Sequence, residues 1–140
     1  MTRQDIEALF ERRLDALIRR DARAFAEAYA DDAVVESPLG GGKVFGLHAV
    51  EEIMRAWLVG FPDAVFTQEE LLIDGNRVVW LARARGTDTG GFMGLPPTAK
   101  PFMLPMVGIC TVDELITAER RIYDFTGLLV QIGVLKAKPA

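Results

Sequence analysis

The sequence has a single cysteine, Cys110, and a single histidine, His48. One thiol cannot build a disulfide framework, and no histidine, cysteine and carboxylate residues have the spacing of a zinc site. No apolar run reaches the roughly 18 residues of a membrane span. The charged start, Met1–Asp5, lacks the apolar stretch of a secretion signal. These absences predict a cytoplasmic protein with no metal and no membrane segment.

Basic residues are also scarce for a nucleic-acid surface. Sixteen Lys and Arg face twenty Asp and Glu, which gives a net charge of −4 and argues against nucleic acid as a partner. The sequence has no phosphate-binding glycine loop, no dinucleotide fingerprint and no G-x-S-x-G elbow. We therefore expect chemistry without a cofactor.

What the sequence has is apolar content, 50% of 140 residues. At roughly 150 residues per domain this length predicts one domain, residues 1–140, and a chain of this size buries roughly two-thirds of its unfolded surface. The N-terminal third has helical periodicity and the rest is extended. We expect helices over 4–20, 22–30 and from Gly46 to Gly60, and strands over 33–38, 65–73, 77–86, 101–112 and 115–124. A short helix over 125–134 and a loose tail over 136–140 complete this α+β pattern.

The segment 101–112 is apolar at both parities of a strand, although an antiparallel sheet normally leaves one face wet. Helices can cover one face. A second subunit or an internal pocket must cover the other, and we expect a homodimer packed sheet to sheet.

Asp124 is the first candidate for a catalytic group. Alternation along the last strand places it inward with Ile116, Ala118 and Ile122, and leaves Arg120 as a charged exception in that row. A carboxyl group that loses solvation acquires a raised pKa and can exchange protons near neutrality. The alternative is a structural role, because Asp124 immediately precedes the last helix and Asp is a favoured N-cap.

Charged residues at the end of the strand 77–86 are further candidates. Arg83 and Arg85 could orient an enolate, but outer-face ion pairs with residues such as Glu69 are more common. Asp88 could contact a substrate or shape the turn before the glycines that follow.

The loop over 90–97 is unusually apolar, and it must lie against a pocket rim or a dimer seam. Together with aromatic and thioether side chains elsewhere it suggests a pocket for an apolar small molecule. The candidate lining residues are Tyr29, Trp57, Trp80, Phe92, Met93, Phe102 and Met106.

Three segments together, 22–38, 86–100 and 119–133, resemble the SnoaL-like polyketide cyclases, within the superfamily named after nuclear transport factor 2. The resemblance implies three helices on a strongly curved, largely antiparallel mixed sheet, forming a cone with an apolar pocket and usually a dimer. It also implies that Asp124 is the acid/base of a metal-free and cofactor-free aldol closure. The position two residues earlier, polar in some cyclases, is Ile122 here, and we expect it to line the pocket.

The sequence departs from two other branches of the superfamily. The base of the steroid delta-isomerases corresponds to Ser37, and their enolate-binding pair corresponds to Arg13 and an apolar stretch near Val107. Limonene-epoxide hydrolases have an arginine where Gly86 stands, although the adjacent Arg85 could replace it in a triad with Asp88 and Asp124.

Three functions therefore stay open. The first is a cofactor-free acid/base enzyme that cyclises or isomerises an apolar carbonyl compound. The second is a non-catalytic dimeric module that binds a hydrophobic small molecule, and the third is an epoxide hydrolase.

Overall fold

The computed structural model describes residues 1–39 and 41–136 and contains four α-helices and a six-stranded sheet. Most of the expected tail, from residue 137 on, lies outside the described residues. The elements in order are α1 (Arg3–Ile18), α2 (Ala22–Ala26), β1 (Tyr29–Ser37), β2 (Gly42–Phe45), α3 (Leu47–Gly60), β3 (Val65–Asp74), β4 (Arg77–Thr87), a 3-10 turn (Phe92–Gly94), β5 (Pro101–Asp113), β6 (Leu115–Ile122) and α4 (Phe125–Gln131).

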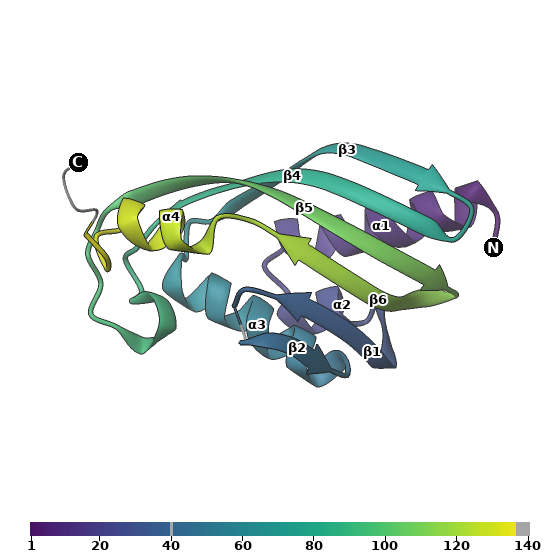
Figure 1. Cartoon of the computed structure of the whole chain (residues 1–140), viewed down its shortest axis with the longest axis horizontal. Coiled ribbons are helices and arrows are strands. Elements are labelled where there is room, and N and C mark those ends of the chain that lie inside the picture. The colour runs from purple at the N-terminus through teal and green to yellow at the C-terminus, as the bar shows by residue number, and fades with distance from the viewer. Residues whose placement is uncertain (40, 137–140) are drawn as a thin grey trace.

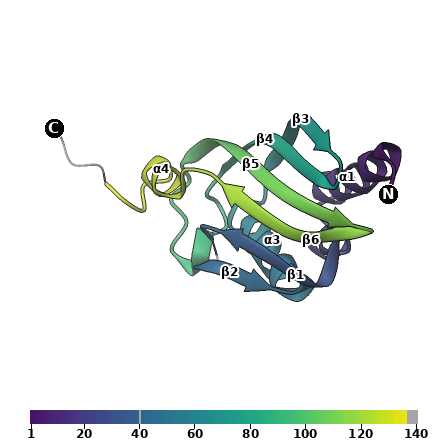
Figure 2. The same ribbon diagram turned by 45° about the vertical axis from the view of Figure 1, so that its right-hand side comes forward.

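The strands form one sheet in the order β2-β1-β6-β5-β4-β3. β1 runs parallel to β6 and every other pair is antiparallel, which makes the sheet mixed and confirms the expected α+β class. Helices α1, α2 and α3 lie on the concave side of the curved sheet, and α4 lies at one end of β5 (Figure 1). The turned view in Figure 2 shows the same two layers, with the long β4 and β5 curving around the helices.

Local sequence signals explain the helix boundaries. Thr2 and Asp5 form a capping box at the start of α1, because each side chain accepts a hydrogen bond from the other residue's backbone N–H. Asp21 caps α2 through the backbone N–H of Ala24. The helix expected over 22–30 is too long, because Tyr29 already belongs to β1. The short edge strand β2 was not expected.

A β-bulge on β6 changes which side chains face the helices. Thr111 pairs with Ala118, whereas the next residue, Val112, pairs with Ile116, so Thr117 is the extra residue of the bulge. After the bulge, the side chains that face the helices are those of Glu119, Arg121 and Tyr123. The expected inward row, with Ala118, Ile122 and Asp124, is therefore wrong beyond Ile116.

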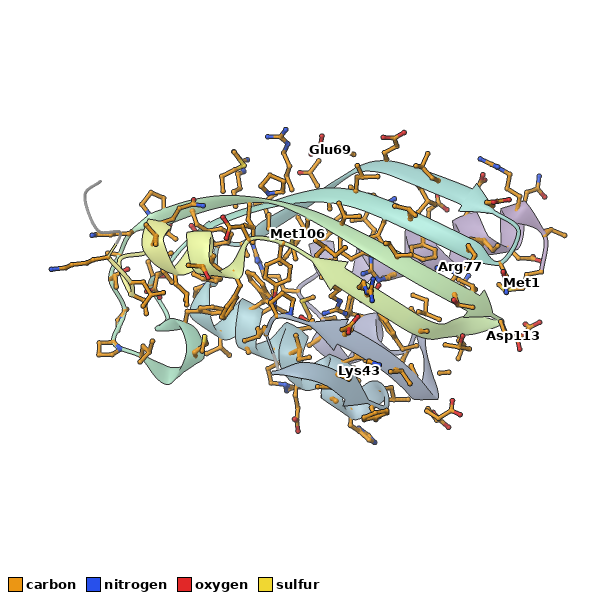
Figure 3. All side chains as sticks on the ribbon, in the orientation of Figure 1. Met1, Lys43, Glu69, Arg77, Met106 and Asp113 are labelled. Carbon is orange, nitrogen blue, oxygen red and sulfur yellow. The ribbon has the colours of Figure 1, made fainter. Side chains whose placement is uncertain are left out.

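The core lies between the sheet and the helices, where side chains fill the interior (Figure 3). At the end nearest α4 it is aromatic: the ring of Phe61 stacks on Phe92 with centroids 4.6 Å apart and tilts against Phe102 at 4.5 Å. On the opposite face of the sheet, Glu69 points outward (Figure 3) and pairs with Arg83 at 2.6 Å, as expected for an outer-face pair. Within residues 1–39 and 41–136, no helix has the length and apolarity that a membrane crossing requires.

Candidate functional site

An apolar cavity lies between α1, α3 and the concave side of the sheet. The centre of a water molecule can occupy about 40 Å³ of it, and the whole empty space, with the open solvent at its mouth included, is about 540 Å³. Apart from Gln68, Tyr123 and two arginines, the side chains around it are aliphatic, aromatic or thioether. The lining residues are Arg13, Leu14, Leu17, Phe25, Met54, Trp57, Phe66, Gln68, Trp80, Ala82, Met106, Arg121 and Tyr123.

The mouth of the cavity is formed where lining residues keep part of their exposure. Leu14 on α1 and Phe66 and Gln68 on β3 are half-buried, and α1 packs against β3 along this edge. The deeper wall is fully buried and includes Trp57 and Arg121. An entering molecule therefore passes Leu14, Phe66 and the amide of Gln68 before it reaches the charged groups at the inner end.

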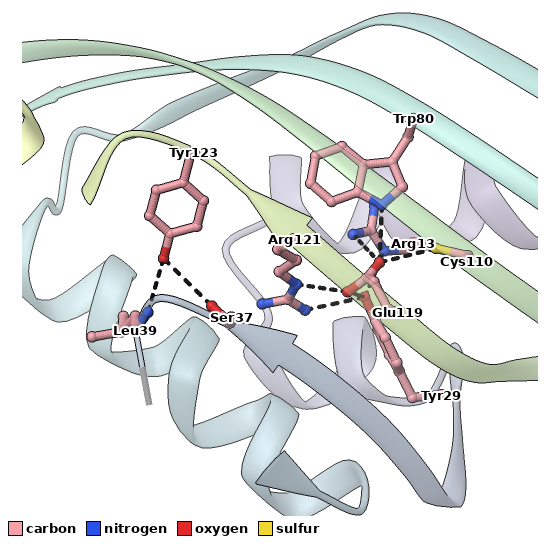
Figure 4. Close-up of polar contacts among 9 residues, drawn as sticks. All are labelled: Arg13, Tyr29, Ser37, Leu39, Trp80, Cys110, Glu119, Arg121 and Tyr123. Atoms are coloured by element: carbon pink, nitrogen blue, oxygen red, sulfur yellow. Dashed lines mark hydrogen bonds and ion pairs between the residues drawn. The ribbon is translucent and has the colours of Figure 1, made fainter. Parts of the chain in front are cut away.

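The inner end of the cavity is closed by a buried polar cluster around the carboxylate of Glu119 (Figure 4). Tyr29 donates its hydroxyl to Glu119 Oε1 at 2.7 Å, and Arg121 donates Nε–H to the same oxygen at 2.6 Å. The other oxygen, Oε2, accepts from Trp80 Nε1 at 2.9 Å, from Cys110 Sγ at 3.2 Å and from Arg13 Nη2 at 3.4 Å. We call these six residues the Glu119 cluster.

The two arginines also share a second acceptor. Arg13 Nε and Arg121 Nη2 each donate to the Tyr29 hydroxyl oxygen at 3.1 Å. Among the described residues Arg121 Nη1 has no hydrogen-bond partner, whereas every fully buried side-chain nitrogen or oxygen of those residues has one, so this nitrogen is not fully buried. Arg121 lines this cavity, so we infer that its Nη1 faces the open space there, and Figure 4 shows this nitrogen pointing away from Glu119.

The surrounding sequence holds the cluster in place. Gly108 on β5 leaves room for the indole of Trp80, because a Cβ at this glycine would lie 1.9 Å from the ring. The guanidinium of Arg13 lies between two aromatic rings, 4.7 Å from the centroid of Phe25 and 5.0 Å from that of Trp80. Such cation–π contacts fix the group without using its hydrogen-bond donors.

Burial and charge act in opposite directions on Glu119. Burial favours its neutral acid, but the guanidinium groups of Arg121 and Arg13, followed by the hydrogen bonds from Trp80 and Tyr29, outweigh that effect and lower the pKa of Glu119 to about 2. Burial raises the pKa of Tyr29 and that of the Cys110 thiol. At neutral pH the cluster therefore contains a carboxylate, a neutral phenol, a neutral thiol and two cations.

Tyr123 forms a second polar feature of the cavity wall. Its hydroxyl accepts a hydrogen bond from the backbone N–H of Leu39 at 3.3 Å and lies 3.4 Å from Ser37 Oγ. Burial raises the pKa of Tyr123, so the side chain stays neutral near pH 7. The ring of Tyr123 packs edge-on against Trp57, with centroids 5.7 Å apart.

Asp124 does not lie where the sequence placed it. Its side chain is exposed, caps α4 by accepting the backbone N–H of Gly127 at 2.8 Å, and does not line the cavity. The expectation of a buried Asp124 is wrong because the bulge at Thr117 reverses the parity of β6. The buried carboxylate of the last strand is Glu119, five residues earlier.

The other two candidates for catalysis also lie outside the cavity. Asp88 is buried, but its carboxylate accepts backbone N–H groups from Gly91, Phe92 and Thr98 and the hydroxyl of Thr98. It organises the loop and does not face a substrate. Arg85 is exposed on the outer side of the sheet. The described residues therefore do not assemble a triad of Asp88, Arg85 and Asp124 around one water molecule.

The expected lining residues divide into three groups. Trp57, Trp80 and Met106 line the cavity as predicted. Three others are buried without lining it: Tyr29 belongs to the Glu119 cluster, and Phe92 and Phe102 pack in the aromatic core. Two are wrong, because Met93 and Ile122 are 49% and 50% exposed. Met93 lies on the loop surface, and Ile122 faces outward because of the bulge.

The charged residues of the cavity were missed, although the sequence carried signals for them. Arg13 follows Ile6, Leu9 and Phe10 at helical spacing, which places it on the buried stripe of α1. Arg120, the charged exception in the expected inward row of β6, faces outward and pairs with Glu36 at 2.7 Å. The charge of Arg120 in an otherwise apolar row thus indicated that the alternation of inward and outward side chains shifts along β6.

The fold agrees with comparisons to known proteins. A sequence model of the SnoaL-like polyketide cyclases matches residues 8–132. The chain therefore belongs to the SnoaL-like polyketide cyclase family. It matches no curated protein by sequence.

Several solved structures are similar over nearly the whole chain. TsrD from Streptomyces laurentii has a TM-score of 0.83 at 22% identity, covering 96% of this chain and 99% of TsrD. AclR from Streptomyces galilaeus, a proposed hydroxylase, has a TM-score of 0.81 at 24% identity, covering 99% of this chain and 87% of AclR. IdmH from Streptomyces antibioticus, a proposed polyketide cyclase, has a TM-score of 0.75 at 27% identity, covering 91% of this chain and 97% of IdmH.

Proposed function

We propose that this protein is a cofactor-free cyclase that binds an apolar carbonyl compound in the cavity and promotes an aldol-type ring closure. The observation that carries the proposal is the Nη1 of Arg121, which has no partner among the described residues and lies at the inner end of a largely apolar cavity. An apolar wall with a few convergent polar groups is typical of a small-molecule site. Membership of the SnoaL-like family and the similarity to IdmH support the same reaction class.

The chemistry follows from where charge develops. Removal of a proton from the carbon next to a carbonyl group places negative charge on the carbonyl oxygen. A guanidinium donor held at that oxygen in a largely apolar site stabilises the enolate more than the neutral ketone, and so lowers the barrier. The enolate carbon then attacks a second carbonyl of the same molecule, forming one C–C bond. The new alkoxide takes back one proton, so the ring closure consumes and releases none.

The proton carrier in this proposal is water. No Asp, Glu or His is among the cavity-lining residues of the described chain, and Glu119 has both oxygens occupied by donors. Water that enters between α1 and β3 can take the proton from the α-carbon and return it to the alkoxide. In this account Asp124 caps a helix, and the enzyme contributes orientation and electrostatic stabilisation.

Because no Asp, Glu or His is among the cavity-lining residues of the described chain, a second candidate function is also favoured: a non-catalytic carrier of a hydrophobic small molecule.

The cyclase and the carrier are distinguished by the exchange of the α-protons of 2-tetralone for deuterium, followed by proton NMR in buffered D₂O. A cyclase accelerates the exchange above the buffer rate, and the Arg121→Met variant reduces the acceleration about 10-fold or more, as expected for loss of one charged donor. The Arg85→Gln variant is the matched control, because Arg85 lies outside the cavity. Exchange at the buffer rate with the unmodified protein would leave only the carrier function.

A further inference from the structure

The Glu119 cluster carries one more positive than negative charge. Arg13 and Arg121 are both cationic, and in the part of the chain that the structure describes Glu119 is the only anion that contacts them, at 3.4 Å and 2.6 Å. Burial keeps Tyr29 and Cys110 neutral. The side chains of all three charged residues are at most 6% exposed. One net positive charge is therefore held inside the molecule.

A buried charge without a counter-ion is costly to folding, because desolvation is not offset by a partner. Removing Arg13 would leave a matched pair of Arg121 and Glu119, and the neighbouring rings of Phe25 and Trp80 could pack against an apolar side chain. Stability alone therefore does not account for the second arginine. The excess charge lies where the cavity ends, since both arginines line it.

We propose that the molecule bound in this cavity is a monoanion, an apolar compound with one carboxylate. That carboxylate accepts a hydrogen bond from one N–H of Arg121 Nη1 and supplies the missing negative charge of the Glu119 cluster, while the second N–H of the same nitrogen is left for the reacting carbonyl oxygen. This inference rests on the proposed function only in using the same cavity. It adds that the substrate carries a carboxylate besides the carbonyl groups that react. One carboxylate matches a net charge of one.

The same geometry sets the orientation of the ligand. The carboxylate lies at the inner end beside Arg121, and the apolar body extends along Trp57 and Met106 toward Leu14 and Phe66 at the mouth. A neutral amide of the same shape keeps the apolar contacts but loses the charge-assisted hydrogen bond, and it places an NH₂ donor against a guanidinium. Charge-assisted hydrogen bonds are markedly stronger than neutral ones.

Binding of 2-naphthoate and of its neutral analogue 2-naphthamide to the whole protein tests the proposal by isothermal titration calorimetry at pH 7. We expect the carboxylate to bind about 10-fold or more tightly than the amide. Equal affinity, a preference for the amide, or no binding of either probe would overturn the proposal.

A series of variants relates this preference to the charge of the cluster. Arg13→Met brings the net charge to zero and should bring the ratio of the two affinities to within about 3-fold of unity, whereas Arg13→Lys keeps the charge and should keep the preference. Arg85→Gln removes the same charge from the outer surface and should leave the ratio unchanged. If Arg13→Met does not fold, the ratio in the unmodified protein and in Arg13→Lys still decides.

The result is separable from the proposed reaction. Selective binding of 2-naphthoate without deuterium exchange of 2-tetralone would support an anion carrier and reject the cyclase. Exchange of 2-tetralone without any preference for 2-naphthoate would support the cyclase and reject the monoanion.

Discussion

Arg121 and Glu119, two residues apart on β6, point to the same side of the sheet and form an ion pair in which Arg121 Nε lies 2.6 Å from Glu119 Oε1. Alternation makes them neighbours on one face, and the bulge at Thr117 decides that this face is the buried one. The pair thus anchors a guanidinium at the end of the cavity.

The Glu119 cluster predicts a specific acid sensitivity. The pKa of Glu119 falls from about 4.5 in the unfolded chain to about 2 in the folded protein, so the unfolded state binds more protons between these pH values. Stability from this group is therefore complete above pH 4.5 and is lost as the pH falls toward 2. Its size is roughly 3 kcal/mol. Urea unfolding measured against pH should show the slope.

The Glu119→Gln variant isolates that contribution. It leaves two buried guanidinium groups without their counter-ion, and we expect the free energy of unfolding at pH 7 to fall by about 3–5 kcal/mol. Its stability should also depend less on pH between 4.5 and 2. Glu36→Gln, which breaks an exposed pair with Arg120, is the control and should cost less than about 1 kcal/mol. Similar losses in both variants would refute a special role of the cluster.

Asp124 tests the distinction between a helix cap and an acid/base group. Asn caps helices about as well as Asp, so Asp124→Asn should change the free energy of unfolding very little, whereas Asp124→Ala should lower it by about 1 kcal/mol. Both variants should exchange the α-protons of 2-tetralone at the rate of the unmodified protein. A large loss of exchange in Asp124→Asn, with stability intact, would return the acid/base role to this residue.

Asp88 is expected to act on loop structure. In Asp88→Asn one carboxylate oxygen becomes an NH₂ donor that faces the backbone N–H groups of Gly91, Phe92 or Thr98. We expect a loss of about 1–3 kcal/mol in the free energy of unfolding, together with faster amide hydrogen exchange over residues 91–98. Asp31→Asn, at an exposed position, is the control. Unchanged exchange in the loop would contradict this role.

The outer face of the sheet predicts a homodimer. Met103 and Ile122 are exposed there by 47% and 50%, and the neighbouring side chains of β5 on this face are also apolar. We expect sedimentation at micromolar concentration to give twice the chain mass of 15.4 kDa. Met103→Glu and Ile122→Glu should each shift the protein toward the monomer, and Ile18→Glu, exposed on α1, should not. A monomeric unmodified protein would exclude sheet-to-sheet pairing.

The sequence predicted the helices and strands more accurately than the residues that form the cavity. The capping residues Thr2 and Asp21 and the hairpin turn at Gly75 act through local chemistry, so α1, the start of α2 and the β3–β4 hairpin were found from it. The parity of β6 depends on one bulged residue, Thr117, which alternation alone does not reveal. The cavity depends on small residues such as Ala82 and Gly108 on neighbouring strands, and their effect appears only once the strands are paired.

The central claim, that the inner end of the cavity binds the oxygen atoms of the ligand, is tested most directly by a crystal structure of the protein with 2-naphthoate. We expect a carboxylate oxygen within about 3.2 Å of Arg121 Nη1, with the rings between Trp57 and Met106. A carboxylate at the mouth with the rings against the arginines, or a molecule bound beside Asp124, would contradict it.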